Sequence, residues 1–233
     1  MSVAIVTGAS RGFGLALTHA LVARGWHVVV DARDAAALTA ATAALVDGGQ
    51  VSAHPGDVTD PAHRQDVVDA AARAGGLDLL VHNASALGPS PLPTLESAPL
   101  SEFHRVLETN VLAPVALTQL ALPLLADAAA PAIVTLSSDA AVEAYAGWGA
   151  YGASKAALDH AAAILAVERP DIRVYAFDPG DMRTDMHQRA FPGEDISDRA
   201  EPESVVPALL RLLEERPASG RYRASDLAAQ VGA

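Results

Sequence analysis

Short runs of β-branched and other apolar residues alternate along the whole chain with stretches rich in Ala and Leu, and this alternation constrains the fold most. Apolar runs of about five residues are typical of strands buried on both faces, with helices as the crossovers between them. The pattern predicts an α/β fold: a doubly wound parallel sheet of about seven strands with helices on both faces. We expect strands at residues 3–7, 27–31, 51–54, 77–82, 132–137, 173–178 and 220–223.

The Ala- and Leu-rich stretches predict the helices that cover this sheet. We expect them at residues 12–24, 34–46, 61–73, 100–125, 149–167 and 203–215. No repeat, low-complexity linker or shift in composition divides residues 1–233, so a single domain is expected. Residues 84–98 and 181–201 are Pro- and Gly-rich and too long for simple turns, and the second stretch is predicted to be a substrate lid.

The overall charge argues against two classes of partner. The chain has 16 Lys and Arg against 28 Asp and Glu, a formal net charge of −12, and no basic cluster stands out. Such a surface repels nucleic acid and anionic membranes, so we expect neither as a partner.

Cysteine, targeting and metal-ligand patterns are missing from the sequence. There is no cysteine, no signal-peptide pattern at the start and no run of about 20 apolar residues. We therefore expect an intracellular, cytoplasmic protein. The 8 histidines are scattered without ligand spacing, so no metal site is expected.

A glycine-rich turn follows the first predicted strand directly and leads into a predicted helix: Thr7-Gly8-Ala9-Ser10-Arg11-Gly12-Phe13-Gly14. Glycines let the main chain turn tightly and approach a ligand, and the free N–H groups at a helix start bind phosphate. A glycine-rich turn without a ligand would have the same residues. The strand before it and the helix after it favour a dinucleotide-binding site.

Charged residues at the end of the second strand bear on the choice between NAD and NADP. An acid there would bond the ribose 2′-hydroxyl of NAD, whereas an arginine would bind the 2′-phosphate of NADP. Arg33 and Arg11 are candidates for a phosphate clamp. Asp31 or Asp34 would repel phosphate if it pointed inward, and solvation at the surface explains any one of these charges equally well.

Polar residues follow the third, fourth and fifth strands at the edge where ligands bind in open α/β sheets. Asp57 could meet an adenine amino group or simply form a turn. Asn83 is short enough to fix neighbouring main chain, and small residues after it would let a ligand approach. Ser137 and Ser138 close the fifth strand, and either hydroxyl would emerge at this edge.

The predicted helix at 100–125 contains Asn110 and, four residues on, Pro114. Proline has no N–H, so the carbonyl of Asn110 loses its usual partner and the helix should kink there. The freed carbonyl could hold a water in a cleft, or the kink could simply face solvent.

Tyr151 and Lys155 lie four residues apart in a predicted helix, on one face. A phenol keeps its proton until about pH 10, but an ammonium within about 4–6 Å favours the phenolate. The pair predicts a tyrosine that exchanges a proton near neutral pH. By itself this spacing also fits two unrelated residues, and the motifs upstream give it meaning.

Together these residues resemble the short-chain dehydrogenase/reductase family in its single-domain, Rossmann-type form. The family's motifs occur in order: Thr7-Gly8-x-x-x-Gly12-x-Gly14, Asp57, Asn83-Ala84, Asn110, Ser138, Tyr151-x-x-x-Lys155 and Pro179-Gly180-x-x-x-Thr184. The resemblance implies an NAD(P)-dependent oxidoreductase that transfers hydride between the nicotinamide and a small-to-medium ketone or alcohol.

The resemblance also implies a role for each matched residue. Tyr151 gives its proton to the carbonyl oxygen, and Lys155 lowers the tyrosine pKa and holds the nicotinamide ribose. Ser138 hydrogen-bonds the substrate oxygen, and Asn110 supports a water in a proton relay to Lys155. The expected cofactor contacts are Gly8, Ser10, Arg11, Gly12, Phe13, Gly14, Arg33, Asp57, Val58, Asn83, Ala84, Tyr151, Lys155, Pro179, Gly180, Met182 and Thr184.

One motif departs from the family pattern, and another position bears on which coenzyme is used. The family's Asn-Asn-Ala-Gly is here His82-Asn83-Ala84-Ser85, so the main chain near the cofactor is expected to differ. The family's NAD-selecting acid aligns with Ala32 and its NADP-selecting arginine with Arg33, so NADP(H) is expected over NAD(H). Asp31 is then a strand-end residue.

A narrower resemblance, in Gly147-Trp148-x-x-Tyr151 and Thr184-Asp185-Met186, is to sepiapterin and benzil reductases. It implies a ketone flanked by a second carbonyl or a ring, and a substrate pocket with Ser85, Trp148 and Met186, although Trp148 fits a core or interface position equally well. Family members pair through the helices that carry the Asn and Tyr motifs, so a homodimer or homotetramer is expected. An NAD-dependent alcohol dehydrogenase and a non-catalytic sensor of NADP are the alternatives.

Overall fold

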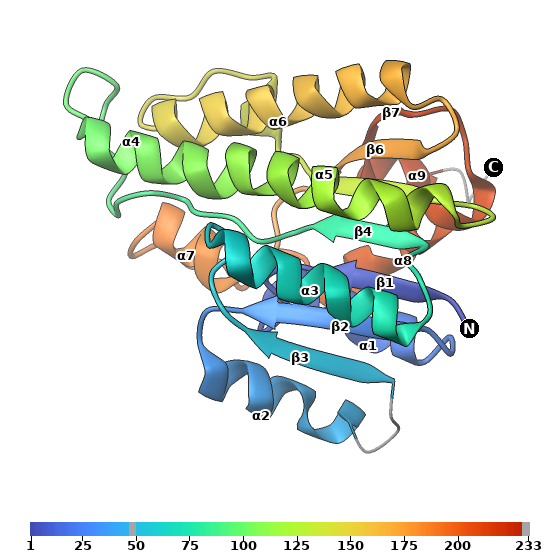
Figure 1. Ribbon diagram of the computed structural model, residues 1–233. Helices are drawn as coiled ribbons and strands as arrows, with labels where there is room; N and C mark the ends of the chain where they lie inside the picture. Colours follow the sequence, from blue (N-terminus) through green and yellow to red (C-terminus); the bar gives the residue numbers. More distant parts are fainter. Residues whose placement is uncertain (47–49, 230–233) are drawn as a thin grey trace.

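The computed structural model describes residues 1–46 and 50–229. Its centre is one parallel seven-stranded sheet with the strand order β3-β2-β1-β4-β5-β6-β7 (Figure 1). The predicted sheet is therefore confirmed, with strands close to the predicted positions. They are β1 (Val3–Val6), β2 (His27–Ala32), β3 (Val51–Pro55), β4 (Leu79–His82), β5 (Ala132–Leu136), β6 (Arg173–Asp178) and β7 (Gly220–Arg223).

Helices cover both faces of the sheet, as Figure 1 shows. One face carries α1 (Gly12–Val22), α2 (Ala35–Val46), α8 (Pro202–Glu215) and α9 (Ala224–Ala229). The other carries α3 (Pro61–Ala74), α5 (Ala113–Ala126) and α6 (Gly149–Glu168). Two further helices lie toward the carboxyl ends of the strands: α4 (Leu100–Leu107), which continues into α5, and α7 (Asp185–Ala190).

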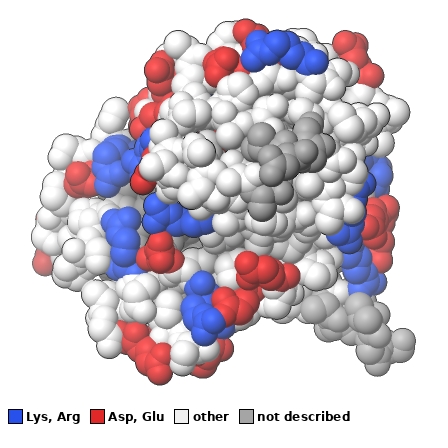
Figure 2. Space-filling view, turned by 90° about the horizontal axis from the view of Figure 1, so that it is seen from below, with Lys and Arg blue, Asp and Glu red and all other residues white. Residues whose placement is uncertain are grey.

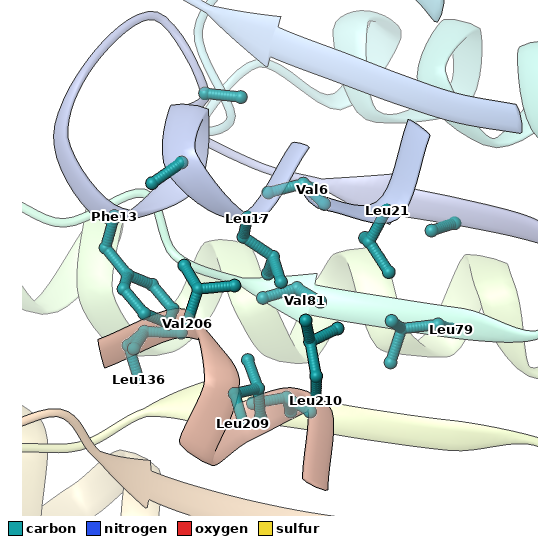
Figure 3. Packing of buried hydrophobic residues seen from close by; sticks show 14 of the residues in the cluster. Val6, Phe13, Leu17, Leu21, Leu79, Val81, Leu136, Val206, Leu209 and Leu210 are labelled. Carbon is teal, nitrogen blue, oxygen red and sulfur yellow. The ribbon is translucent and has the colours of Figure 1, made fainter. Parts of the chain in front are cut away.

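Alternate residues of each strand serve the two faces, because successive side chains of a strand point in opposite directions. In β1, Val6 packs with Leu17 of α1 and Leu209 of α8 (Figure 3). Its neighbour Ile5 packs on the opposite side with Leu117 of α5 and others. Both faces are therefore dry, and the sheet is a rigid base for the loops at its edges.

The sheet reverses its winding between β1 and β4, which lie side by side. The chain moves outward from β1 to β3 and then returns to build β4 to β7 on the other side. In open α/β sheets such a reversal leaves a crevice at the carboxyl ends of the strands, where ligands bind. The glycine-rich turn after β1 and the polar residues after β4 both lie at this position.

The predicted helix at 100–125 is interrupted where the sequence predicts a kink. A π-helical turn, Glu108–Leu112, separates α4 from α5 and contains Asn110. Pro114, near the start of α5, has no N–H to offer the carbonyl of Asn110. Leu100–Ala126 is also the one described stretch with the length and hydropathy of a membrane-crossing helix, and Leu117 and Leu125 within it pack in the core.

Two short helices were not expected from the sequence. The first, α7, lies inside the predicted irregular stretch 181–201, where the hydroxyl of Thr184 accepts a hydrogen bond of 3.2 Å from the main-chain N–H of His187 and caps the helix. The second, α9, follows β7 directly and buries Leu227 against α8. Each has six residues, and they are stabilised by the Thr184 cap in α7 and by packing on α8 in α9.

Candidate active site

A cleft of about 610 Å³ opens at the carboxyl ends of the strands. Predicted site residues that line it are Gly8, Ser10, Arg11, Gly12, Phe13, Arg33, Asp57, Val58, Asn83, Ala84, Ser85, Tyr151, Lys155, Pro179, Met182, Thr184 and Met186. Other predicted residues do not line it: Gly14, Asn110, Ser138, Trp148 and Gly180. Lining residues that were not predicted include Thr109, Arg183, Asp185, Arg189 and Glu203.

The glycine-rich turn is closely packed. Gly8 has a φ of +68°, and a Cβ there would come within 2.8 Å of the Cα of Ala84. A Cβ at Gly14 would overlap the side-chain amide of Asn83. Only glycine fits at these two places, which explains their spacing in the sequence.

The first helix offers main-chain N–H groups to an anion. Arg11 is the residue before α1 and makes no capping hydrogen bond through its side chain, and the first turn contains no acid. Uncapped N–H groups at a helix start bind phosphate, aided by the helix dipole. Together with the tight turn, this end of α1 fits the diphosphate of a dinucleotide.

Asn83 fastens the end of β4 to the glycine-rich turn. Its side-chain amide donates hydrogen bonds to the carbonyls of Thr7 and Gly8, at 2.8 and 3.0 Å. The hydroxyl of Thr7 in turn accepts from the main-chain N–H groups of Asn83 and Ala84, each at 3.0 Å. The predicted role of Asn83 in fixing neighbouring main chain agrees with this geometry.

Asp31 points inward, below the turn, and is only 2% exposed. Its carboxylate accepts a 2.7 Å hydrogen bond from the N–H of Gly8 and lies 3.2 Å from Nε2 of His63 on α3. The hydrogen bond to Asp31 raises the pKa of His63 despite its burial. Asp31 is therefore a structural support of the turn: it lines the cleft, but its carboxylate oxygens are engaged by Gly8 and His63.

Arg33 lies exposed at the rim of the cleft without an ion-pair partner among the described residues. Arg11 differs from the expectation of a shared clamp, because its guanidinium lies 2.8 Å from the carboxylate of Asp185 in α7. Both side chains of that pair are more than half exposed, so it contributes little to stability. Asp34 caps α2 through the N–H of Ala37 at 2.9 Å.

Asp57 forms a turn at the rim. Its carboxylate accepts two 2.9 Å hydrogen bonds from the main chain and hydroxyl of Thr59. Burial raises the pKa of the Asp57 carboxyl, but these bonds and the charge of Arg33 outweigh it, and the net pKa is lowered. Asp57 is thus held ionised beside Arg33.

Charged side chains on the side of the molecule where β3 and α2 lie, the lower side in Figure 1, are of mixed sign. Figure 2 shows basic and acidic groups interleaved, with wide uncharged areas between them. There is no continuous basic surface on this face of the kind that binds a phosphate backbone. The arginines near the cleft are instead separate groups, each with acids close by.

Tyr151 and Lys155 lie together on α6, as their spacing predicts. Both are buried, and Nζ of Lys155 is 5.4 Å from the centre of the Tyr151 ring. Nζ also donates a 2.6 Å hydrogen bond to the main-chain carbonyl of Leu136, at the end of β5. Lys155 is the only lysine in the chain.

The expected lowering of the Tyr151 pKa is not found. Burial raises the pKa of the phenol, and the charges of Asp139 and Asp178 act in the same direction. Hydrogen bonds with Ser138 and Ser85 oppose the rise without overcoming it. The ammonium of Lys155 does not reverse it, because it faces the ring and bonds to Leu136.

Burial lowers the pKa of Lys155 to about 8, although the carboxylates of Asp159 and Asp178 act against this. Only 3% of the residue is exposed. The cost of burying the ammonium outweighs the attraction of these carboxylates, so the lysine gives up its proton more easily than in water.

The two serines at the end of β5 have different partners. Ser137 donates a 2.6 Å hydrogen bond to the carboxylate of Asp159, behind the cleft. Ser138 contacts the phenol of Tyr151 and donates to Asp139 at 2.9 Å. From the position of the strand end alone, either hydroxyl could reach the cleft; in the structure it is Ser138 that contacts Tyr151.

Asn110 is buried and joins three segments. Its side-chain amide donates to the carbonyl of Ala86 and the hydroxyl of Ser154, each at 2.9 Å. Its side-chain oxygen accepts from the N–H of Ala86 at 2.7 Å and the hydroxyl of Ser85 at 3.2 Å. The π-helical turn thereby fixes the loop after β4 against α6.

An aromatic and apolar cluster lies beside Tyr151. The ring centre of Trp148 is 5.5 Å from that of Tyr151 and 5.9 Å from that of Phe191, which the sequence did not single out. Leu87 and Met186 pack against the same group. Phe191 and Met186 come from the stretch 181–201, so this stretch meets Tyr151 and Trp148 through apolar contacts.

Known proteins share this fold and these motifs. A family profile described as short chain dehydrogenase matches residues 2–195. A benzil reductase ((S)-benzoin forming) of Saccharomyces cerevisiae is 32% identical over 216 residues, which are 89% of this chain and 80% of the yeast protein. A sepiapterin reductase of Mus musculus is 33% identical over 204 residues, 81% of this chain and 77% of its own.

One solved structure matches nearly the whole length. A short chain dehydrogenase from Shigella flexneri, crystallised with NADP, superposes with a TM-score of 0.90 at 29% sequence identity. The match covers 96% of this chain and 97% of that one.

Proposed function

The chain belongs to the short-chain dehydrogenase/reductase family, and we propose that it is an NADPH-dependent ketone reductase with Tyr151 as its proton donor. The family and its benzil and sepiapterin reductase branch were predicted from the sequence, and the matches confirm both. An NAD(P)-dependent oxidoreductase acting on a small molecule follows from the family. One observation carries the finer proposal: Tyr151, Ser138 and Lys155 meet beside the cleft that the glycine-rich turn opens.

Each of these residues has a distinct task during reduction. NADPH, when bound, supplies the hydride. Tyr151 donates its phenolic proton to the carbonyl oxygen, and Ser138 donates a hydrogen bond to the same oxygen as negative charge develops there. Burial raises the pKa of the phenol, which keeps Tyr151 protonated until the substrate oxygen needs the proton.

Lys155 and Asn110 support this step. Lys155 lies at the floor of the cleft, where it would hold the nicotinamide ribose, and Pro179, Met182 and Thr184 would bind the same end of the cofactor. Gly180 follows Pro179 in the chain but does not itself line the cleft. Asn110 holds the loop after β4 in place and would support a water that returns protons to Lys155.

NADP(H) is the preferred coenzyme in this proposal. Arg33 is exposed at the rim of the cleft, so its guanidinium is available to a 2′-phosphate. Of the two acids that could repel the phosphate, Asp31 is buried and bonded to Gly8 and His63, and Asp34 accepts a hydrogen bond from the N–H of Ala37 at the start of α2. The similar Shigella flexneri structure was crystallised with NADP.

A ketone with an aromatic ring or second carbonyl next to it suits the pocket best. Trp148 and Phe191 offer ring faces and edges beside Tyr151, with Ser85 and Met186 at the cleft surface. Offset or edge-on aromatic contacts stabilise such a substrate beyond simple burial. The similar yeast protein is named for the reduction of benzil, a diketone.

Closure and assembly complete the proposal. The stretch 181–201, with α7, would act as a lid within the single nucleotide-binding domain.

Exposed apolar residues on the π-helical turn, α5 and α6, among them Leu112, Val115, Ile164 and Val167, suit a homodimer or homotetramer in the cytoplasm.

A carbonyl panel tests the proposal directly. Purified protein is mixed with NADPH or NADH and with 1,2-diketones, aryl ketones, pteridine ketones and aldehydes, and loss of reduced cofactor is followed by absorbance. We expect oxidation of NADPH with at least one diketone or aryl ketone, and a lower kcat/KM with NADH. Tight NADPH binding without turnover on any carbonyl would indicate a binding protein instead, and preference for NADH with alcohols would indicate an NAD-dependent dehydrogenase.

A further inference from the structure

Arg221, in the last strand, reaches across the carboxyl edge of the sheet behind the candidate active site. Its Nη2 donates hydrogen bonds to the carboxylate of Asp178 at 2.7 Å and to the main-chain carbonyl of Ser138 at 2.9 Å. Its Nε lies 3.2 Å from the carboxylate of Asp159 and 3.3 Å from the hydroxyl of Ser137. One guanidinium thus connects β5, β6 and α6.

These contacts act on the main chain that presents Ser138. Ser138 has extended main-chain angles, φ −159° and ψ 158°, just before the short helical turn Asp139–Ala141. Its carbonyl is held by Arg221, while its hydroxyl faces Tyr151. A planar guanidinium fixes such positions better than a flexible ammonium because its donors have a rigid arrangement.

The same guanidinium balances two carboxylates behind Lys155. Asp159 lies one helical turn after Lys155 on α6, and Asp178 closes β6; both side chains are largely buried. One carboxylate oxygen of Asp159 is buried without a hydrogen-bond partner among the described residues. Arg221 is the cation within hydrogen-bonding distance of both carboxylates.

Titratable and charged groups reach the surroundings of Tyr151 and Lys155 from several elements. Asp159 lies with them on α6, Asp139 begins the helical turn after Ser138, Asp178 ends β6, and Arg221 lies on β7. Arg223, two residues on, is more distant, at 3.8 Å from Asp178, and is nearly half exposed. Removal of Arg221 therefore leaves two anions near the lysine without their main counter-charge.

We propose that Arg221 is a positioning residue of this active site, which fixes the main chain of Ser138 and balances the two carboxylates behind Lys155. Its meaning for turnover rests on the proposed function, whereas its effect on the charge state of Lys155 does not. A purely structural role, that of attaching β7 to the sheet, is the alternative.

Arg216 offers a matched control for that alternative. It too joins segments of the sheet, since its guanidinium donates to the carbonyls of Ala130 and Pro131 at 2.8 and 3.1 Å. These carbonyls lie just before β5, at the opposite end of the strand from Ser138. Arg216→Met should cost stability in the same way while leaving the active site untouched.

The decisive measurement uses the single lysine. Protein labelled with ¹³C-lysine gives one side-chain signal, whose titration reports Lys155 directly and without turnover. We expect Arg221→Met to move this titration to higher pH, because a neighbouring cation is lost. Asp159→Asn should move it to lower pH, because an anion is lost, and Arg216→Met should leave it in place.

Kinetics then test the positioning role. Arg221→Met should lower kcat roughly ten- to a hundredfold, the worth of a charge-assisted hydrogen bond, while the NADPH dissociation constant changes by less than about twofold. Arg221→Lys should recover part of kcat, and Arg216→Met should leave kcat unchanged.

Two results would overturn the inference. One is a lysine titration that is the same in Arg221→Met as in the wild type; the other is a kcat unchanged by Arg221→Met in active enzyme. If Arg221→Met does not fold, the lysine titration of Asp159→Asn becomes the test. A titration of Asp159→Asn that is the same as in the wild type would show that this cluster does not act on Lys155. A wild-type protein that reduces no carbonyl would refute the proposed function, and the titration would still decide the inference.

Discussion

The two halves of the sheet offer a ligand different kinds of surface. The nucleotide half, β1 to β3 with α1 to α3, presents main-chain N–H groups and exposed arginines, and its buried acid Asp31 supports the glycine-rich turn from below. The reaction half, β4 to β7 with the later helices, presents buried polar side chains, among them Asn110 and Lys155. Binding of a flexible diphosphate needs only donors and space, whereas proton transfer needs side chains held in place.

This difference indicates that cofactor choice and turnover depend on different parts of the protein. In the nucleotide half a mutation at the rim should change which cofactor is used without affecting the chemistry. In the reaction half a mutation should change turnover or the charge state of a buried group without affecting cofactor choice. Three experiments test this separation.

The largest effect is expected in the reaction half, from Tyr151→Phe. Loss of a general acid costs roughly two to four decades of turnover. Because the phenol is absent but the ring remains in contact with Trp148, NADPH binding measured by fluorescence should stay near the wild-type value.

Tyr222→Phe is the control, since that phenol bonds only to the carbonyl of Ala218 and lies outside the cleft. Near-native turnover of Tyr151→Phe on an accepted ketone would remove Tyr151 from its assigned role.

A change of stability with pH is expected from Lys155→Met. Below about pH 8 the lysine is charged in both folded and unfolded states, and the folded state bears the cost of burying it. From about pH 8 to 10.5 the folded state loses the proton first, so the free energy of unfolding of the wild type rises relative to the variant.

Lys155→Met should therefore be more stable than the wild type at pH 7, by of order 3 kcal/mol at most, and the gain should disappear near pH 10.5. Chemical denaturation at several pH values measures this difference. A gain that does not depend on pH would mean that hydrophobic packing, and not the buried charge, is responsible.

The smallest effect is expected in the nucleotide half, from Arg33→Ala. The variant should lose about ten- to a hundredfold in kcat/KM with NADPH, because a charge-assisted phosphate contact is lost, and little with NADH. Arg24→Ala, at an exposed arginine paired with Glu214 away from the cleft, should change neither value. Equal losses of kcat/KM with both cofactors would show that Arg33 does not bind the 2′-phosphate of NADPH. They would also contradict the proposed separation of cofactor choice from turnover between the two halves.

The sequence predicts the sheet well because buried parallel strands leave a strong pattern of continuous apolar residues. It also predicts that Tyr151 and Lys155 share a face, since four residues make about one helical turn. Those inferences need only local geometry.

Other features depend on contacts between distant segments, and the sequence could not supply them. The inward orientation of Asp31 depends on Gly8 and on His63 in α3. Arg11 and Asp185, which form an ion pair, are 174 residues apart in the chain, and Arg221 and Ser138, which are also in contact, are 83 residues apart. The direction of the Tyr151 pKa shift was predicted wrongly because burial, which spacing does not reveal, outweighs the nearby charge.

The single lysine has a practical consequence. Reagents that acylate primary amines, such as activated esters used for labelling or immobilisation, find no ε-amine on the outside of this folded chain, because the only one is 3% exposed. Modification of that amine then requires the floor of the cleft to open, and the rate of modification would report how often the floor opens. A cofactor bound above Lys155 should lower the rate at which its amine is acylated.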